Sequence, residues 1–150
     1  MKIAVINLQN KIAVCQNKIK EVIRGALRLE RIRKRGEITV SLMPDREIRK
    51  LNTMYLGRYC PTDVISFDIS REKKELIADI AVSTDTAARN AKKYRTSPCF
   101  EIYLYVIHGL LHILGYDDVN QSKRKKMHER TKFILATLKI TPSTQLGLLP

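Results

Sequence analysis

Residues 37–45 read Glu-Ile-Thr-Val-Ser-Leu-Met-Pro-Asp, and this stretch decides the fold class. Ile38, Val40 and Leu42 alternate with polar or small residues, which is the pattern of a strand with one buried face. The Pro-Asp pair that follows is typical of the first turn of a helix. A half-buried strand that passes directly into a helix indicates a domain in which both kinds of element share one core.

The flanking segments add further strands and helices. A strand is expected over 2–8, followed by a helix that has Asn17 as its N-cap, runs into the basic stretch 31–35 and stops at Gly36. Two apolar runs, 64–69 and 76–82, are separated by charged residues and predict a hairpin of two strands. Helical periodicity predicts three more helices, of which the first starts at Thr84 and the others cover 100–114 and 122–138. The whole pattern predicts an α+β fold, a small mixed β-sheet with packed helices.

The length and composition fit one domain with a single core. The chain has 150 residues, of which 44% are hydrophobic. We assign residues 1–140 to this domain and residues 141–150 to a C-terminal tail. No apolar run approaches the ~20 residues of a membrane span, and no secretory signal is expected. The three cysteines form no paired motif, so reduced thiols and a cytoplasmic location are expected.

The charge favours a polyanionic partner. Lys and Arg number 28 against 15 Asp and Glu, which gives a formal net charge of +13. Basic residues also solvate exposed helix faces, so charge alone does not identify the partner. Arg31, Arg33, Lys34 and Arg35 form one basic cluster that could follow a nucleic-acid backbone. Aromatic residues make up 6% of the chain and Trp is absent, so no base-stacking platform is evident.

Residues 105–118, Tyr-Val-Ile-His-Gly-Leu-Leu-His-Ile-Leu-Gly-Tyr-Asp-Asp, carry the clearest chemical pattern. On a helix, His108 and His112 lie one turn apart on one face, so both rings can reach the same ion. Gly115 can end the helix in a left-handed conformation and let the chain bring Asp118 back to the rings. Two imidazoles and one carboxylate make a three-ligand set that leaves a position for water. The segment predicts a metal site on a helix of the C-terminal half.

Each residue of this pattern also has a simpler interpretation. A single histidine on an apolar helix face is more often a hydrogen-bonded core residue, and Asp118 could cap a helix that begins near Asn120 or Ser122. The combination at ligand spacing favours the metal site. The same spacing is similar to the zinc motif of metzincin proteases, in which a Glu after the first His is the general base. Here that position is Gly109, so a peptidase is not favoured.

Residues 108–118 resemble the signature of the YbeY family, which are bacterial metal-dependent endoribonucleases of ribosomal RNA maturation. Residues 51–55 with 61–67 are similar to the family's second block and 78–83 to its third, so the resemblance covers roughly residues 37–138. It implies a single-strand-acting hydrolase of phosphodiesters that matures the 3′ end of small-subunit ribosomal RNA and serves ribosome quality control. It also implies ribosomal RNA and the ribosome as partners.

The chain departs from the family pattern at two positions. The family usually has a third His where this chain has Asp118, which keeps a ligand but replaces a nitrogen by an anionic oxygen. Zinc is still the expected single divalent ion, with harder metals more competitive. The family also usually has an Arg where this chain has Leu56. The nearest arginine is Arg58, whose guanidinium could bind the scissile phosphate at two points, with a solvated loop arginine as the alternative.

The expected chemistry is hydrolysis assisted by a metal ion. His108, His112 and Asp118 would hold the ion, which lowers the pKa of water and polarises a phosphoryl oxygen. Asp117 could act as a base, orient an imidazole or serve in the turn, and attack by the 2′-hydroxyl of RNA is another route. The alternative from another class is a non-catalytic ribosome-binding or RNA-binding protein with a fold-stabilising metal, for which His128 is the candidate fourth ligand.

Overall fold

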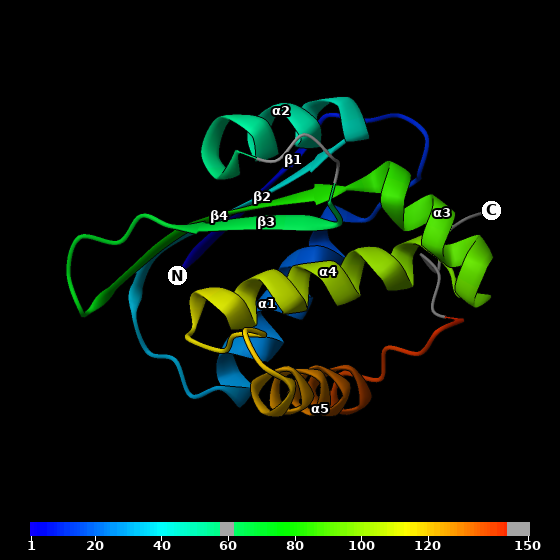
Figure 1. Cartoon of the computed structure of the whole chain (residues 1–150). Helices are drawn as coiled ribbons and strands as arrows, with labels where there is room; N and C mark the ends of the chain where they lie inside the picture. Colours follow the sequence, from blue (N-terminus) through cyan, green and yellow to red (C-terminus); the bar gives the residue numbers. More distant parts are fainter. Residues whose placement is uncertain (58–61, 144–150) are drawn as a thin grey trace.

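The sheet of the computed structural model combines parallel and antiparallel strands (Figure 1), and the structure describes residues 1–57 and 62–143. The described elements are β1 (Lys2–Asn7), α1 (Gln16–Leu29), β2 (Arg35–Met43), α2 (Asp45–Leu56), β3 (Val64–Asp68), β4 (Glu75–Ser83), α3 (Thr84–Tyr94), α4 (Pro98–Ile113) and α5 (Gln121–Thr137). The strand order is β1-β2-β4-β3, in which β1, β2 and β4 are parallel and β3 is antiparallel to β4. The α+β prediction and the predicted hairpin are confirmed.

Helices cover both faces of the sheet. Figure 1 shows α2 on one face, α1 and α4 on the other, and α5 beyond α1 and α4. Ile38, Val40 and Leu42 of β2 are 0% exposed and belong to the main core on the α1 and α4 side. Side chains of opposite orientation, such as Ile65 of β3, pack with Ile48 of α2 in a smaller cluster. The alternation read from the sequence therefore places a core on each face of the sheet.

The predicted boundaries of the first helix are wrong. Its N-cap is Cys15, and Asn17 lies inside α1. The helix ends at Leu29, where Ile32 N–H donates to Leu27 O at 2.9 Å and Arg31 adopts a φ of 57°. These local hydrogen bonds satisfy the terminal carbonyls without a glycine. Residues 31–34 of the basic stretch are therefore a loop, and Arg35 is the first residue of β2.

Gly36 is part of β2, where it allows a close approach between strands. It pairs with Leu76 of β4 and has a φ of 141°. A Cβ at this position would lie 2.0 Å from the backbone oxygen of Leu76. Only glycine combines this conformation with this contact. The residue that resembled a helix stop is thus required by its neighbour strand.

Helix α4 is the central helix and carries both histidines. Its N-cap, Ser97, accepts a hydrogen bond from Phe100 N–H at 3.0 Å, and the helix ends before Gly115, which has a φ of 105°. A Cβ on Gly109 would lie 3.0 Å from Cγ2 of both Ile80 and Val64. Gly109 therefore lets α4 lie close against β3 and β4. The helix predicted over 100–114 and its glycine stop are confirmed.

The C-terminal part of the described chain packs against the same core. Ile140 is buried, and the carbonyl of Pro142 accepts a hydrogen bond from Ser97 N–H at 2.9 Å. Residues 144–150 of the assigned tail lie outside the described residues. In the described ranges, no helix has the length and apolar character needed to cross a membrane. Cys15 and Cys99 are free thiols, and Cys60 lies outside the described residues.

Candidate metal centre

A cleft of about 410 Å³ runs along β3, an edge strand of the sheet, between α2 and α4. Three groups of residues line it: Asn52 and Leu56 of α2, Thr62 to Phe67 at and before β3, and His108, Gly109, His112 and Asp118 from α4 and the turn after it. The three candidate ligands therefore face one cleft, although Asp118 lies beyond the helix that carries the histidines. Figure 1 shows this part of α4 beneath β3 and the end of α2 above it.

The turn after α4 brings Asp118 to the cleft. Gly115 N–H donates to His112 O at 3.1 Å and Tyr116 N–H donates to Leu111 O at 3.0 Å, which closes the helix in a Schellman-type turn. The Tyr116 hydroxyl donates to the Glu30 carboxylate at 3.0 Å, and Arg130 of α5 forms an ion pair with the same carboxylate. Burial and the hydrogen bond to Glu30 raise the pKa of Tyr116, which keeps the hydroxyl protonated as a donor. Glu30, which follows α1, and Arg130 of α5 thus hold the turn after α4 through Tyr116.

The candidate ligands are available for coordination. His108 is half-buried, whereas His112 and Asp118 are exposed. None of the three side chains forms a hydrogen bond or an ion pair within residues 1–57 and 62–143. In these ranges, no group of three or more His, Cys, Asp or Glu side chains is arranged to hold a metal ion. By their chemistry, two imidazoles and one carboxylate are donors that fit a divalent ion.

The contacts of Asn120, Asp117 and His128 show which structural role each of these neighbouring residues has. Asn120 is the N-cap of α5 and accepts from Lys123 N–H at 2.9 Å, so Asp118 is not this cap. Asp117 accepts from Val119 N–H at 3.2 Å and pairs with Lys123 at 3.4 Å, which gives it a role in the turn. His128 lies on α5, exposed, and does not line the cleft.

The position at which the family has an arginine faces the cleft. Leu56 lines it and is 53% exposed, so a longer cationic side chain at 56 would reach the same space. Arg58 lies outside the described residues, so its assigned contact with phosphate stays a prediction. Hydrogen bonds fix Asp63 beside the start of β3: its side-chain carboxylate accepts from Val64 N–H at 2.8 Å, and its backbone carbonyl accepts from Ser83 N–H at 2.9 Å.

Several cleft residues were not identified as site residues from the sequence. Thr62, Asp63 and Ser66 line the cleft, and their only signal was their place in the segment 61–67. Behind this wall, Glu101 of α4 is 3% exposed. Burial raises the pKa of Glu101, and the negative charge of Asp63 adds to this effect. Glu101 is thus a buried acid whose pKa lies above its usual value.

The predicted basic residues divide into two groups. Arg33, Lys34 and Arg35 line a groove of about 840 Å³ together with Lys73 and Lys74 from the β3–β4 turn. Glu72 and Glu75 line the same groove, so its basic residues outnumber its acids by five to two. Arg31 is exposed and does not line this groove. A hydrogen bond from Arg35 N–H to Lys74 O at 3.2 Å joins the start of β2 to the β3–β4 turn. Figure 1 shows the α1–β2 connection and the β3–β4 turn at the same end of the sheet.

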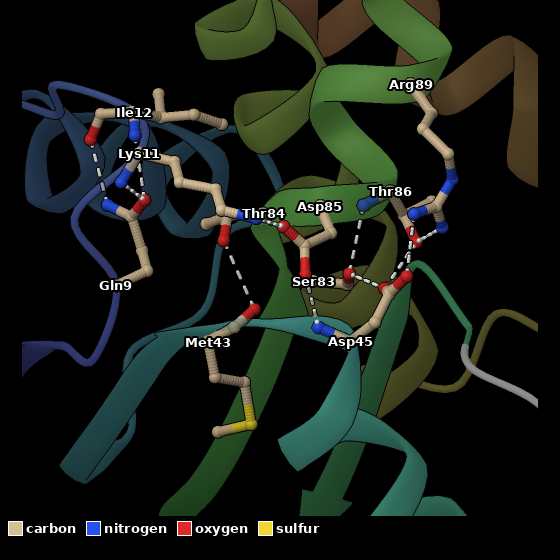
Figure 2. A network of polar contacts seen from close by, with 10 residues as sticks. All are labelled: Gln9, Lys11, Ile12, Met43, Asp45, Ser83, Thr84, Asp85, Thr86 and Arg89. Carbon is tan, nitrogen blue, oxygen red and sulfur yellow. Dashed lines mark hydrogen bonds and ion pairs between the residues drawn. The ribbon is translucent and has the colours of Figure 1, made fainter.

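A third cleft, of about 620 Å³, lies at the carboxyl ends of the parallel strands. Asp85 lines this cleft and accepts from Asp45 N–H at 2.9 Å. Beside the cleft, Asp45 pairs with Arg89 at 2.7 Å and accepts from Ser83 at 2.5 Å, as Figure 2 shows. Burial raises the pKa of Asp45, but the hydrogen bonds from Arg89 and Ser83 outweigh it and leave the pKa lowered. These contacts tie β2 and β4 to the helices that follow them.

The fold and the cleft along β3 define a class: a small α+β protein with two histidines and a carboxylate beside an edge strand. The family model described as "Endoribonuclease YbeY" matches residues 4–139. The chain therefore belongs to the YbeY family of endoribonucleases, which are hydrolases that act on RNA.

Curated relatives agree with this assignment, and one solved structure shares the fold. The endoribonuclease YbeY of Syntrophus aciditrophicus is 38% identical over 81% of this chain and 79% of the relative. That of Desulforamulus reducens is 34% identical over 93% of this chain and 99% of the relative. The solution structure of TM1509 from Thermotoga maritima has the same fold, with a TM-score of 0.61 at 22% identity and 97% coverage of both chains.

Proposed function

We propose that this chain is a metal-dependent endoribonuclease that hydrolyses phosphodiesters of single-stranded ribosomal RNA. Its role would be maturation of the 3′ end of the small-subunit RNA and ribosome quality control, in the cytoplasm and with the ribosome as partner. The observation that carries the proposal is that His108, His112 and Asp118 line one cleft in a chain of the YbeY family.

The proposed cofactor is one divalent ion, with zinc first. His108 and His112 would supply imidazole nitrogens and Asp118 a carboxylate oxygen, which is a donor set of catalytic zinc sites. When bound there, such an ion would lower the pKa of water and act as a Lewis acid toward a phosphoryl oxygen. Three protein ligands would leave one coordination position of such an ion for water.

The protein's own residues would orient the RNA. Tyr116 and the Glu30–Arg130 ion pair hold the turn that presents Asp118, so this carboxylate is positioned from outside the cleft. Arg58 would bind the scissile phosphate through two N–H groups and balance its charge. Position 109 lacks the protease base, and a Cβ there would make tight contacts of 3.0 Å with side-chain methyl groups of Ile80 and Val64.

The basic loop would bind the RNA backbone away from the cleft. Arg33, Lys34 and Arg35 form no ion pair within the described ranges, and Lys73 and Lys74 extend the same groove. Arg31 would add a contact from the beginning of the loop. Basic side chains without acidic partners neutralise phosphates and release counterions, so they contribute affinity with little sequence preference.

The test measures RNA cleavage by three proteins after chelation and after addition of zinc or manganese. Wild type should regain cleavage with metal. His112→Ala should lose at least about 100-fold while keeping its RNA affinity, because even partners outside the ligand shell commonly contribute 10- to 100-fold. His128→Ala is the matched control and should behave as wild type. Equal cleavage by His112→Ala and wild type, or no cleavage by any protein, would contradict the proposal.

The role of Arg58 has its own test. Arg58→Ala should lower the cleavage rate, and adding Leu56→Arg to that variant should restore part of it, because position 56 faces the cleft. A rate unaffected by Arg58→Ala would assign this arginine to the solvated loop.

A further inference from the structure

The end of α2 exposes three consecutive large apolar side chains beside the cleft. Met54 is 70% exposed, Tyr55 60% and Leu56 53%. Successive side chains of a helix point in different directions, so each of the three is considered by its own surroundings. Leu56 lines the cleft, and Tyr55 is its neighbour in the chain.

An aromatic contact joins Tyr55 to a residue that lines the cleft. Its ring lies 5.1 Å from that of Phe67, centroid to centroid, at an interplanar angle of 63°. Phe67 is half-buried on β3 and lines the cleft. An edge-to-face pair of this kind orients the rings, and the large exposed fraction of Tyr55 leaves ring surface open to a ligand.

The other exposed aromatic rings of the described chain are occupied. Tyr94 has the Lys93 ammonium 5.2 Å from its centroid, and Phe133 has the Arg130 guanidinium at 4.6 Å. No such cation lies over Tyr55 within residues 1–57 and 62–143. Tyr55 also differs in position: unlike Tyr94 and Phe133, it lies next to residues that line the cleft.

We propose that Tyr55, oriented by Phe67, is a base-stacking subsite for a nucleotide of the RNA strand that lies in the cleft. This inference rests on the proposed function, which brings RNA to this cleft. Every nucleobase has an open π-face, so stacking on an exposed aromatic ring binds single strands without a required sequence. A base-paired strand has its bases stacked internally, so the subsite favours unpaired RNA. The basic groove and the net charge of +13 make RNA a better occupant than an apolar protein segment.

The test measures the affinity of an eight-nucleotide single-stranded RNA in the presence of a chelator, so that no cleavage occurs. Tyr55→Leu should weaken binding by about 5- to 150-fold, the range for loss of one stacked base. Tyr55→Phe keeps the ring and should stay within about 2-fold of wild type. Phe133→Leu is the control for loss of an exposed aromatic ring elsewhere and should bind as wild type.

A second RNA series separates stacking from general packing. RNAs with one abasic residue, moved along the strand, should include one position at which wild type and Tyr55→Leu bind equally. Equal affinity of Tyr55→Leu and wild type for the intact RNA, or no binding by wild type, would overturn the inference. Cleavage is measured separately with metal: a stacking effect without cleavage would reject the proposed function and retain the subsite. Unchanged free energies of unfolding would show that the variants fold.

Discussion

The cleft along β3 and the cleft at the carboxyl ends of β1, β2 and β4 are both polar, but their side chains are used differently. At the strand ends, Asp45 and Asp85 accept bonds from the backbone, hydroxyls and Arg89, as in Figure 2. Along β3, His108, His112 and Asp118 make no such bonds within the described ranges. Polar groups that are mutually satisfied stabilise a fold, whereas groups held in a cleft without partners are available to a ligand.

The volume of a cleft does not identify the candidate metal centre. The cleft at the strand ends, at about 620 Å³, is larger than the candidate metal centre, at about 410 Å³. Its residues join two strand-to-helix connections, so its polar contacts have a structural explanation. Variants in the β3 cleft should therefore change activity with little effect on stability, and variants at the strand ends should do the reverse.

The largest effect is expected at Asp118. Asp118→Ala should lower RNA cleavage at least about 100-fold, because it removes a ligand, and should leave the free energy of unfolding nearly unchanged. Asp117→Ala removes the adjacent carboxylate, which serves the turn, and should cost less than about 10-fold. Asp118→His, with the residue usual in the family, should keep cleavage. Similar losses in both alanine variants would assign the effect to the turn and not to a ligand.

The next effect concerns stability at the strand ends. Asp45→Ala should lower the free energy of unfolding by about 1–3 kcal/mol, since it removes the acceptor for Arg89, Ser83 and Thr86. Lys11→Ala removes an exposed ion pair with Asp85 and should cost less than about 1 kcal/mol. Denaturant unfolding measures both, and cleavage per folded molecule should be unchanged. Loss of cleavage in folded Asp45→Ala would contradict the division between the two clefts.

The pH dependence of stability should report the same network. The pKa of Asp45 is lowered below its usual 3.8, so the unfolded chain takes up this proton first as the pH falls. The contribution of Asp45 is therefore complete above about pH 5 and is lost as the pH falls through the lowered pKa. Unfolding of wild type and Asp45→Asn at several pH values should give a difference that shrinks toward low pH. A difference that grows there would contradict the assigned sign.

The smallest effect is expected in the basic groove. Each phosphate contact to a single strand contributes about 0.7 to the slope of log affinity against log salt, so Lys73→Ala with Lys74→Ala should lower the slope by at most about 1.4. Lys92→Ala with Lys93→Ala, in the last turn of α3, is the control and should leave the slope unchanged. Equal slopes for wild type and the groove variant would remove the β3–β4 turn from the RNA surface.

Elements defined by their own periodicity were predictable from the sequence. The strand of residues 37–43, the hairpin and α4 with its glycine stop follow from local apolar spacing. The end of α1 was not predictable in this way, because the role of Gly36 depends on Leu76, a partner 40 residues away. A glycine after a basic helix indicated a C-terminus, and only the register of β2 with β4 shows the close approach.

For the candidate site, sequence spacing indicated the cleft residues on α4 and in the turn after it, but not those that the strands supply. The helical spacing of His108 and His112 and the turn at Gly115 singled out three residues that line one cleft, and their role as ligands stays a prediction. Asp63 and Ser66 reach the cleft because β3 is an edge strand, which its sequence does not reveal. Likewise, a low aromatic content gave no sign that Tyr55 and Phe67 meet. Lys73 and Lys74 join the basic loop only through strand pairing.

The most direct test of the central claim is the zinc content of the purified protein after chelation and titration with zinc. The account predicts one tightly bound zinc ion per chain in wild type and in His128→Ala, and loss of that ion in His112→Ala with an unchanged fold. Equal zinc binding by His112→Ala and wild type, or none by wild type under conditions in which it cleaves RNA, would contradict the assignment of His108, His112 and Asp118 as metal ligands.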